Sequence, residues 1–392
     1  MNYFFDKYKL TIFAAVILIV SFLPVIAQEN NSTSQEQLSN EPTSNNQSDN
    51  STANQVTNQI TNQTNLPQND EIRLLFAGDT HFLWGVKDQQ NRKGIFSPLA
   101  KIKPLFDSAD YRVINLETVI SAEGKSINNK TYVFRSEPEN LNALRQLGVN
   151  TVFLANNHTI DLGAEGIKQT IQEMKKSGIG FTGLGLTEAE AITPHIAEIG
   201  NIKIAFYSVN LIGSKDTFAI GNQPGTGYIT PGFYASLKAV KRLVNYVVVG
   251  VHWGKEYEVF STDDQRDLAR TLLRNGADAI IGHHSHVPQG VEIIDGKPVI
   301  YSLGNFLFGS ANYQQTDNLI AVIQVNRKTM KLSGIELMPV TGQFRKTGYV
   351  LDIPSIEDRS LFFEEMFLMC RKLNPYQKIT VDDRMAKMVI QP

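Results

Sequence analysis

Six of the seven histidines in this chain of 392 residues occur in four short polar clusters. Each cluster lies at or just after an apolar run of the kind that forms a buried strand. In an α/β sheet, side chains that follow strand ends converge in the crevice where such folds bind ligands. Imidazole and carboxylate side chains gathered in this way are typical of a metal site. The clusters are Gly78-Asp79-Thr80-His81, Asn156-Asn157-His158, His252-Trp253-Gly254 and Gly282-His283-His284-Ser285-His286.

The spacing within the clusters predicts which side chains share a face. Side chains alternate between two faces in an extended segment, so Asp79 and His81 should point the same way. By the same rule His284 and His286 share a face and His283 points away from it, which favours a packing role for His283. A carboxylate and an imidazole two residues apart can reach one divalent ion. Two imidazoles two residues apart can serve two neighbouring ions.

Three further residues complete a donor set of mixed oxygen and nitrogen atoms. Glu117 follows an apolar strand and supplies a carboxylate that can bridge two cations. Asn157 offers a neutral carbonyl oxygen, and His252 offers a nitrogen at the end of another strand. The set contains no thiolate, which excludes a structural zinc site of the cysteine type and favours a catalytic site with open positions. Each residue alone also has a structural explanation, such as a turn-forming Asp79, so the combination carries the metal hypothesis.

The elements that must position these residues follow an α/β order. From Glu71 onward, apolar runs of strand type alternate with segments of helical periodicity. A strand-rich run from Val291 to Val325 without helices suggests a second sheet, and two packed sheets with helices outside them account for this order. The polar stretches 84–93, 120–130 and 210–227 are expected to be long loops. We expect strands at 72–77, 111–116, 131–134, 151–155, 203–208, 246–251 and 278–282, and helices at 97–106, 138–147, 164–177, 231–244, 263–275 and 361–373.

The first seventy residues are expected to lie outside the folded domain. Lys7 and Lys9 precede an apolar stretch at 10–27, which is typical of a secretory signal. This stretch approaches the ~20 residues that span a bilayer, so an uncleaved N-terminal anchor is the alternative. Either reading predicts an exported protein, secreted or held at the cell surface. The expected organisation is a signal or anchor at 1–27, a disordered linker rich in Asn, Gln, Ser and Thr at 28–70, the folded domain at 71–350, and a C-terminal helix and tail at 351–392.

Composition argues against a nucleic-acid-binding protein and against a fold stabilised by disulfides. The formal net charge of −2 and the isoelectric point near 6.4 leave no basic footprint for nucleic acid. Cys370 is the only cysteine, so the chain cannot form an intramolecular disulfide, and its place on an apolar helix face favours packing over catalysis.

The ordered motifs resemble those of calcineurin-like metallophosphoesterases. The variant most similar to this chain is the capsule-synthesis CapA, or poly-γ-glutamate biosynthesis, family. Besides the histidine clusters, the matching segments are Asn115-Leu116-Glu117, Phe134-Arg135 ahead of Pro138, Asp161-Leu162-Gly163, and Tyr301-Ser302-Leu303-Gly304-Asn305-Phe306. The similarity covers about residues 73–340, nearly the whole folded part.

The resemblance implies a four-layer α/β/β/α sandwich that holds two divalent metal ions, such as Mn, Fe or Zn. It implies that Asp79, His81 and His286 bind one ion, that Asn157, His252 and His284 bind the second, and that Glu117 bridges them. His158 would then lie beside the metals as a substrate-facing acid or charge stabiliser. The chain departs from the broader phosphoesterase pattern at Glu117, where an aspartate is usual, and at Thr159, where an acid is usual.

Two more residues are candidates for contact with a substrate. The guanidinium of Arg135 could clamp an anionic group in a bidentate manner, although a surface salt bridge is an equal alternative. Asn305 follows Gly304 and could either shape a turn or act in the site.

Two functions are compatible with these observations. The first is a metal-dependent hydrolase that acts on a phosphoester. The second is a tethered accessory protein that binds poly-γ-glutamate or another anionic capsule polymer for a membrane-bound synthesis machinery without cleaving it. No glycine-rich phosphate loop of the Walker type is present, which disfavours an ATP-dependent ligase.

Overall fold

The computed structural model describes residues 70–122, 126, 131–310 and 317–392. The predicted signal or anchor at 1–27, and all but the last residue of the predicted linker, lie outside the described residues. Within the described part, no helix combines the length and the apolar character that crossing a bilayer requires.

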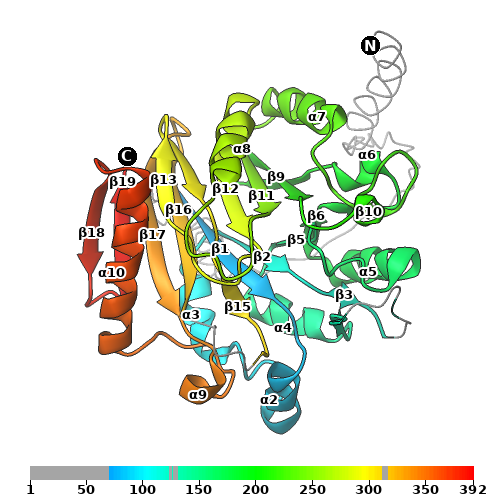
Figure 1. The fold of residues 1–392 in the computed structure, drawn as a ribbon, viewed down its shortest axis with the longest axis horizontal. Helices are drawn as coiled ribbons and strands as arrows, with labels where there is room; N and C mark the ends of the chain where they lie inside the picture. Colours follow the sequence, from blue (N-terminus) through cyan, green and yellow to red (C-terminus); the bar gives the residue numbers. More distant parts are fainter. Residues whose placement is uncertain (1–69, 123–125, 127–130, 311–316) are drawn as a thin grey trace, which may run out of the picture.

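A nine-stranded sheet forms the larger half of the framework (Figure 1). Its central strands are parallel from β1 to β6, and β16 and β17 add to it in antiparallel fashion. The strand order is β18 (Lys378–Asp382), β19 (Lys387–Gln391), β17 (Leu332–Val340), β16 (Asn318–Asn326), β1 (Glu71–Thr80), β2 (Tyr111–Leu116), β5 (Thr151–Phe153) and β6 (Gly180–Thr182), with β15 (Asn305–Leu307) paired to the end of β1.

A six-stranded sheet packs against the first. Its order is β13 (Val291–Ile294), β14 (Lys297–Ile300), β12 (Ala279–His283), β11 (Tyr246–His252), β9 (Ile202–Asn210) and β8 (His195–Ile199). Two short pairs join β3 (Val119–Ile120) to β4 (Arg135–Ser136) and β7 (Leu184–Gly185) to β10 (Gly225–Thr226).

Helices cover the outer face of each sheet, with α7 and α8 above and α3 and α4 below in Figure 1. The α-helices are α2 (Gly85–Lys93), α3 (Lys103–Asp107), α4 (Asn140–Leu147), α5 (Gly163–Ser177), α6 (Glu188–Ala191), α7 (Pro231–Lys241), α8 (Asp263–Arg274), α9 (Phe344–Thr347) and α10 (Ile356–Leu373), and the 3₁₀ turns are η1 (Ala100–Ile102) and η2 (Lys215–Thr217).

Strand alternation explains the layers, because successive side chains point to opposite faces. In β1, Leu75 joins the core beneath the helices α3, α4 and α5, whereas Leu74 and Phe76 enter the core between the sheets. In β11, Val248 faces the core between the sheets and Val249 faces the helices α7 and α8. Three apolar cores separated by two sheets confirm the predicted four-layer α/β/β/α sandwich.

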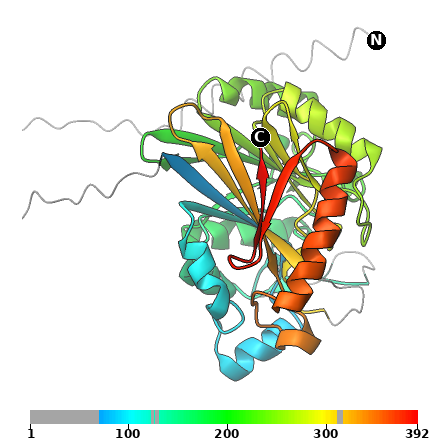
Figure 2. The ribbon, with the colours of Figure 1, turned by 90° about the vertical axis from the view of Figure 1, so that its left-hand side faces the viewer.

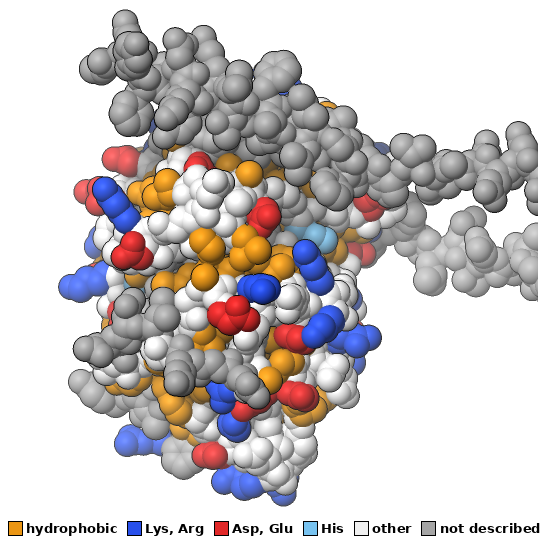
Figure 3. All heavy atoms as spheres, turned by 90° about the vertical axis from the view of Figure 1, so that its right-hand side faces the viewer, with side chains coloured by type: hydrophobic (Ala, Val, Ile, Leu, Met, Phe, Trp, Pro, Cys, Tyr) orange, Lys and Arg blue, Asp and Glu red, His pale blue; other side chains and the backbone are white. Residues whose placement is uncertain are grey.

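The surface is electrostatically mixed. On the face shown in Figure 3, acidic and basic side chains of the described residues are interspersed rather than gathered by sign, as the small net charge suggests. Histidine is scarcely visible on this face. Among the clustered histidines, the buried ones are His81, His252, His283, His284 and His286.

Several predicted elements differ from the structure. The predicted loop at 84–93 is mostly the helix α2, which periodicity missed because this helix buries only Gly85 and Val86. The predicted strand at 131–134 is replaced by the two-residue β4, and the helix at 97–106 is limited to η1 and α3. The strand-rich run after Val291 is divided, since β13 and β14 join the second sheet and β15 and β16 return to the first.

The predicted C-terminal tail is the clearest correction. The helix is present as α10, but the residues after it form the hairpin β18–β19, which extends the large sheet. Met388 and Ile390 of β19 are fully buried in the core between the sheets, so burial of apolar side chains holds this segment in place.

Candidate metal centre

The carboxyl ends of strands from both sheets meet at one place. In the first sheet Asp79 at the end of β1 lies opposite Asn115 of β2 and Asn305 of β15. In the second sheet His252 ends β11 and lies opposite His283, which ends β12. Parallel strands end at the same edge, so residues far apart in the sequence are brought to one crevice.

A β-bulge at Gly78 directs Asp79 into this crevice. Ala77 pairs with Ile114 but Asp79 pairs with Asn115, so β1 contains one extra residue there. Without the bulge Asp79 would share the helix-covered face with Ala77; with it, Asp79 faces the second sheet. A Cβ at position 78 would lie 1.9 Å from the backbone oxygen of Gly304, so only glycine fits.

The turn after β12 presents two imidazoles by an unusual backbone. His284 and His286 have positive φ angles of 93° and 58°, in the region that non-glycine residues seldom adopt. The segment is therefore a bend rather than the extended chain that we assumed, yet the two rings still come within 5.9 Å of each other. Strained backbone of this kind is concentrated at functional sites.

One group of donors surrounds His252. Its Nε2 atom lies 2.8 Å from the Asn157 Oδ1 atom and 3.1 Å from the His284 Nδ1 atom. The Oε1 atom of Glu117 is 3.6 Å away. Four predicted ligands from four separate segments thus point toward one another.

A second group surrounds Asp79. Its Oδ2 atom lies 3.3 Å from His286 Nδ1 and accepts a hydrogen bond from the backbone N–H of His284 at 3.2 Å. Asn115 donates to Asp79 Oδ1 at 2.7 Å, and its amide also lies 3.4 Å from His252 Nδ1. Asn115 therefore links the two groups of donors. Asn115 belongs to the motif Asn115-Leu116-Glu117, but the sequence did not predict its contacts with Asp79 and His252.

Glu117 lies between these groups, and its environment is the clearest indication that this place suits a cation. Its carboxylate is fully buried, and neither oxygen has a hydrogen-bond partner. The donor atoms of Glu117, His284 and His286 all lie within 4.8 Å of one another. A buried carboxylate without a hydrogen bond is costly unless a positive charge accompanies it. This donor set of carboxylates, imidazoles and an amide oxygen fits divalent metal ions.

Electrostatics at this point also favour positive charge. Burial and the neighbouring Asp79 carboxylate raise the pKa of Glu117 well above its usual value. Burial lowers the pKa of His284 to about 3, so this imidazole is neutral and able to coordinate a metal. Burial alone would lower the pKa of His286 too, but the Glu117 and Asp79 carboxylates raise it to about 9.

His158 stands at the side of the cluster and is held by two neighbours. Its Nδ1 atom lies 2.8 Å from Asp161 Oδ2, and its ring stacks on Phe134 with centroids 3.7 Å apart. The backbone N–H of Phe134 also donates to Asp161 Oδ2 at 2.8 Å. The His158 side chain is 13% exposed, so it can meet a molecule in solution, whereas the Asp161 carboxylate is fully buried.

His81 is buried among aromatic rings. Phe134, Phe308 and Trp84 lie with ring centroids 4.7, 4.0 and 5.0 Å from its own, and its Nε2 atom has no hydrogen-bond partner. Trp84 has a positive φ of 53° and is 42% exposed beside the cluster. Residue spacing did not predict the contacts of His81 with Phe134 and Trp84.

The remaining candidates have partners of their own. Asn305 Oδ1 lies 2.9 Å from His286 Nδ1, and its amide donates to the His286 backbone oxygen at 3.3 Å, so it orients this imidazole. Arg135 donates from Nη1 to the Ala122 backbone oxygen at 2.5 Å. Contact of either residue with a substrate stays a prediction. His283 lies 3.5 Å from Asp79 Oδ1.

Comparisons with known proteins agree with the motifs. A sequence profile of the bacterial capsule synthesis protein family (PGA_cap) matches residues 73–310, a range that contains every predicted site residue. The PGA biosynthesis protein CapA of Bacillus subtilis is 29% identical over 275 residues, which cover 69% of this chain and 72% of that protein. The capsule biosynthesis protein CapA of Bacillus anthracis is 27% identical over 291 residues, with 70% and 69% covered.

Two more distant similarities were found. A Mycobacterium tuberculosis protein named "Probable polyglutamine synthesis accessory protein" is 26% identical over 251 residues, which cover 59% of this chain and 66% of that protein. Among solved structures, the NAD nucleotidase of Haemophilus influenzae aligns with a TM-score of 0.44 and 12% identity, covering 76% of this chain and 63% of that one.

Proposed function

The chain belongs to the bacterial capsule synthesis protein family, and we propose that it is an exported, metal-dependent hydrolase that acts on a phosphoester during the synthesis of capsule or poly-γ-glutamate. The observation that carries the proposal is the fully buried carboxylate of Glu117, which has no hydrogen-bond partner and lies among converging imidazoles. The names of the two Bacillus relatives support the polymer as the biological context.

The contacts support two metal positions. Asn157, His252 and His284 converge on one side of Glu117, and Asp79 with His286 lies on the other. These are the sets that the family resemblance assigns to separate ions, with His81 joining Asp79 and His286. A pair of divalent cations held by these residues would polarise a phosphoester and make water a better nucleophile.

His158 is the residue we assign to proton transfer. The Nδ1 atom of His158 is engaged by Asp161, so the proton given to a leaving oxygen comes from Nε2. Stacking on Phe134 fixes the ring plane, so little reorientation is required during the reaction. Asp161 is thus a positioning residue, and it stands two residues after Thr159, the position where the broader family carries an acid.

The division of roles is tested with three variants of the full chain. After loading with Mn²⁺, bound metal is measured by elemental analysis and turnover with p-nitrophenyl phosphate esters. We expect His284→Ala to lose metal, and His158→Ala to keep its metal while losing turnover by about 10² to 10⁴-fold. Asp161→Asn should keep metal and lose less turnover than His158→Ala. Equal metal loss in the His158 and His284 variants would refute the assignment.

A second candidate function is a tethered accessory that binds an anionic polymer without cleaving it. The name of the M. tuberculosis relative favours it, as do the departures from the phosphoesterase pattern at Glu117 and Thr159. Saturable binding of poly-γ-glutamate without product, and no esterase turnover in any metal, would support this function instead. Cell fractionation followed by N-terminal sequencing tests export, and it separates a cleaved signal from a retained anchor at 1–27.

A further inference from the structure

The strand β18 ends the large sheet and has an open side. It pairs with β19, and no strand of the described chain pairs with its other edge. Figure 1 shows it at the left-hand end of the sheet, and Figure 2 looks onto the same end, with the hairpin and α10 toward the viewer. The unpaired backbone groups of such an edge are a template for another strand.

The sequence of β18 complements itself. Its residues are Lys378-Ile379-Thr380-Val381-Asp382, with opposite charges at the ends and strong strand formers between them. In antiparallel pairing with the same strand of a second copy, centred on Thr380, each Lys378 lies opposite an Asp382 and each Ile379 lies opposite a Val381. Parallel pairing would place like charges opposite each other, which is destabilising.

The charge pattern of the outer sheet face continues into this arrangement. On that face Asp382 lies opposite Lys387 of β19. Lys387 pairs with Glu336 of β17 at 2.7 Å, and Glu336 pairs with Arg73 of β1 at 2.7 Å. Positive and negative charges thus alternate toward the edge, where the row ends on the acidic Asp382. Asp382 Oδ1 accepts hydrogen bonds from the backbone N–H groups of Arg384 and Met385, and a lysine from the second copy would continue the alternation of charges.

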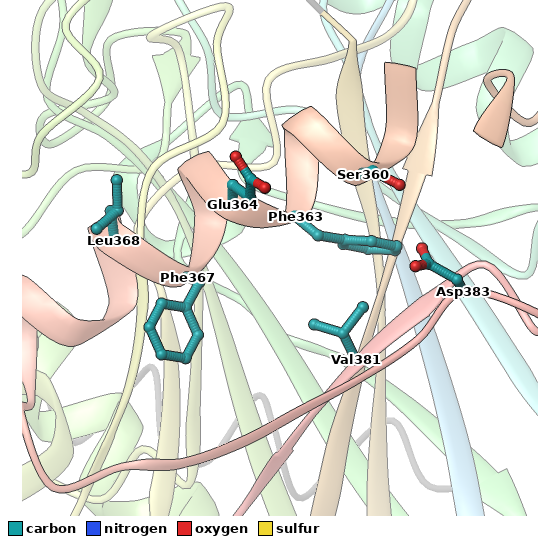
Figure 4. Close-up of a pocket in the computed structure, with 7 residues that line it drawn as sticks. All are labelled: Ser360, Phe363, Glu364, Phe367, Leu368, Val381 and Asp383. Atoms are coloured by element: carbon teal, nitrogen blue, oxygen red, sulfur yellow. The ribbon is translucent and has the colours of Figure 1, made fainter. Parts of the chain in front are cut away.

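Exposed apolar side chains lie beside the same edge. Between α10 and β18 is a groove of about 470 Å³, lined by Phe363, Phe367 and Val381 among others (Figure 4). Val381 is 45% exposed, and Leu368 of α10, which also lines the groove, is 67% exposed. Continuation of the sheet across a two-fold axis would shield these groups with their counterparts in the second copy.

A protective role for the charges fits less well. Strand edges that avoid pairing are commonly very short, carry charged side chains such as lysine along the edge, or have a charge pointing into the contact. In β18 the charges occupy only the two ends and have opposite signs, while the middle positions are Ile379, Thr380 and Val381. We infer that β18 is the self-pairing surface of a symmetric dimer, in which two copies of this chain join their large sheets edge to edge in antiparallel register.

Charge reversal tests the register. The purified full chain is examined by sedimentation velocity over a range of concentrations, with circular dichroism to verify folding. Lys378→Asp and Asp382→Lys each replace two attractive pairs by two repulsive ones, so each variant alone should dimerise roughly ten- to thirtyfold more weakly. An equimolar mixture of the two variants restores opposite charges at both ends and should form a heterodimer. Lys168→Asp, on the exposed face of α5, is the matched control and should dimerise normally.

Cross-linking gives a second readout that does not depend on charge. Thr380→Cys places two thiols opposite each other at the two-fold axis, so diamide should yield a covalent dimer. Met385→Cys is also exposed but lies outside the paired residues, and it should stay monomeric on a reducing-agent-free gel. Buried Cys370 does not compete. A monomeric wild-type chain, a dimer insensitive to Lys378→Asp, or no heterodimer in the mixture would overturn the inference.

Discussion

Replacing Glu117 with glutamine should stabilise the metal-free protein and destabilise the metal-loaded protein. In the metal-free protein both carboxylate oxygens are buried without hydrogen bonds, and such a group costs about 1–3 kcal/mol. The isosteric amide never ionises, so at a pH above the raised pKa of Glu117 the variant avoids the cost of the buried charge. We therefore expect a gain of about 1 kcal/mol, which is about 2 °C in melting temperature for a domain of this size.

With metal bound, the sign changes. A cation present at a hundred times its dissociation constant stabilises the folded wild-type chain by about 2.7 kcal/mol. Glutamine removes the charged donor that we propose both metal positions share, so most of this increment should disappear in the variant. The measurement is thermal unfolding, followed by circular dichroism, in EDTA and in a Mn²⁺ series.

Glu336→Gln provides the matched control. Glu336 is also a buried carboxylate, but Arg73 and Lys387 each contact it at 2.7 Å, far from the cluster. Its replacement should destabilise the metal-free and metal-loaded protein equally and leave the Mn²⁺ increment unchanged. If Glu117→Gln keeps the full Mn²⁺ increment, the reasoning that places a cation at this carboxylate is refuted.

Three further outcomes are expected. Gly78→Ala should lose bound metal and at least ~1–3 kcal/mol of stability, because its Cβ would meet the Gly304 oxygen; Gly232→Ala, with its nearest neighbour at 3.4 Å, should retain both in the same metal analysis and melt. Burial opposes ionisation of Glu336, but Arg73 and Lys387 hold its pKa below the usual value. Its ion pairs should therefore contribute about 1–2 kcal/mol above pH 4.5, and this contribution should be lost as the pH falls through the folded-state pKa. The difference in chemical unfolding free energy between wild type and Glu336→Gln should accordingly shrink toward acid pH; a constant difference would contradict the pairing. Burial raises the pKa of the Cys370 thiol to about 12, so a thiol reagent at pH 8 should label it only after unfolding, and rapid labelling of the native chain would show that the core around it opens.

Local sequence was sufficient to find most of the ligand candidates. Each lies at the end of an apolar run, and the hydrophobic pattern alone predicts strands such as β1, β2 and β11. The alternation of side chains then predicts a residue's face wherever the strand is regular. The order of these elements also predicts two packed sheets with helices outside them, and the family resemblance makes this a four-layer sandwich.

Elements with weak local signals were mistaken or missed. The helix α2 has few apolar residues, so it has no stripe that would indicate a helix. The hairpin β18–β19 was predicted as a tail, because its ordering depends on the burial of Met388 and Ile390 between sheets that form from distant parts of the chain. Two-sheet burial is a property of the assembled fold and not of a short segment.

The geometry of the site was decided by the tertiary structure. The bulge at Gly78 reverses the face of Asp79 because the backbone of Gly304 passes against it, a contact across more than two hundred residues. Positive φ angles bring His284 and His286 together. Strand alternation also predicted that they share a face, but this rule does not apply because the segment is a bend. Residue types and order determine which donors are available, but only packing between the two sheets determines which donors meet, since distance and direction depend on contacts that a local pattern does not contain.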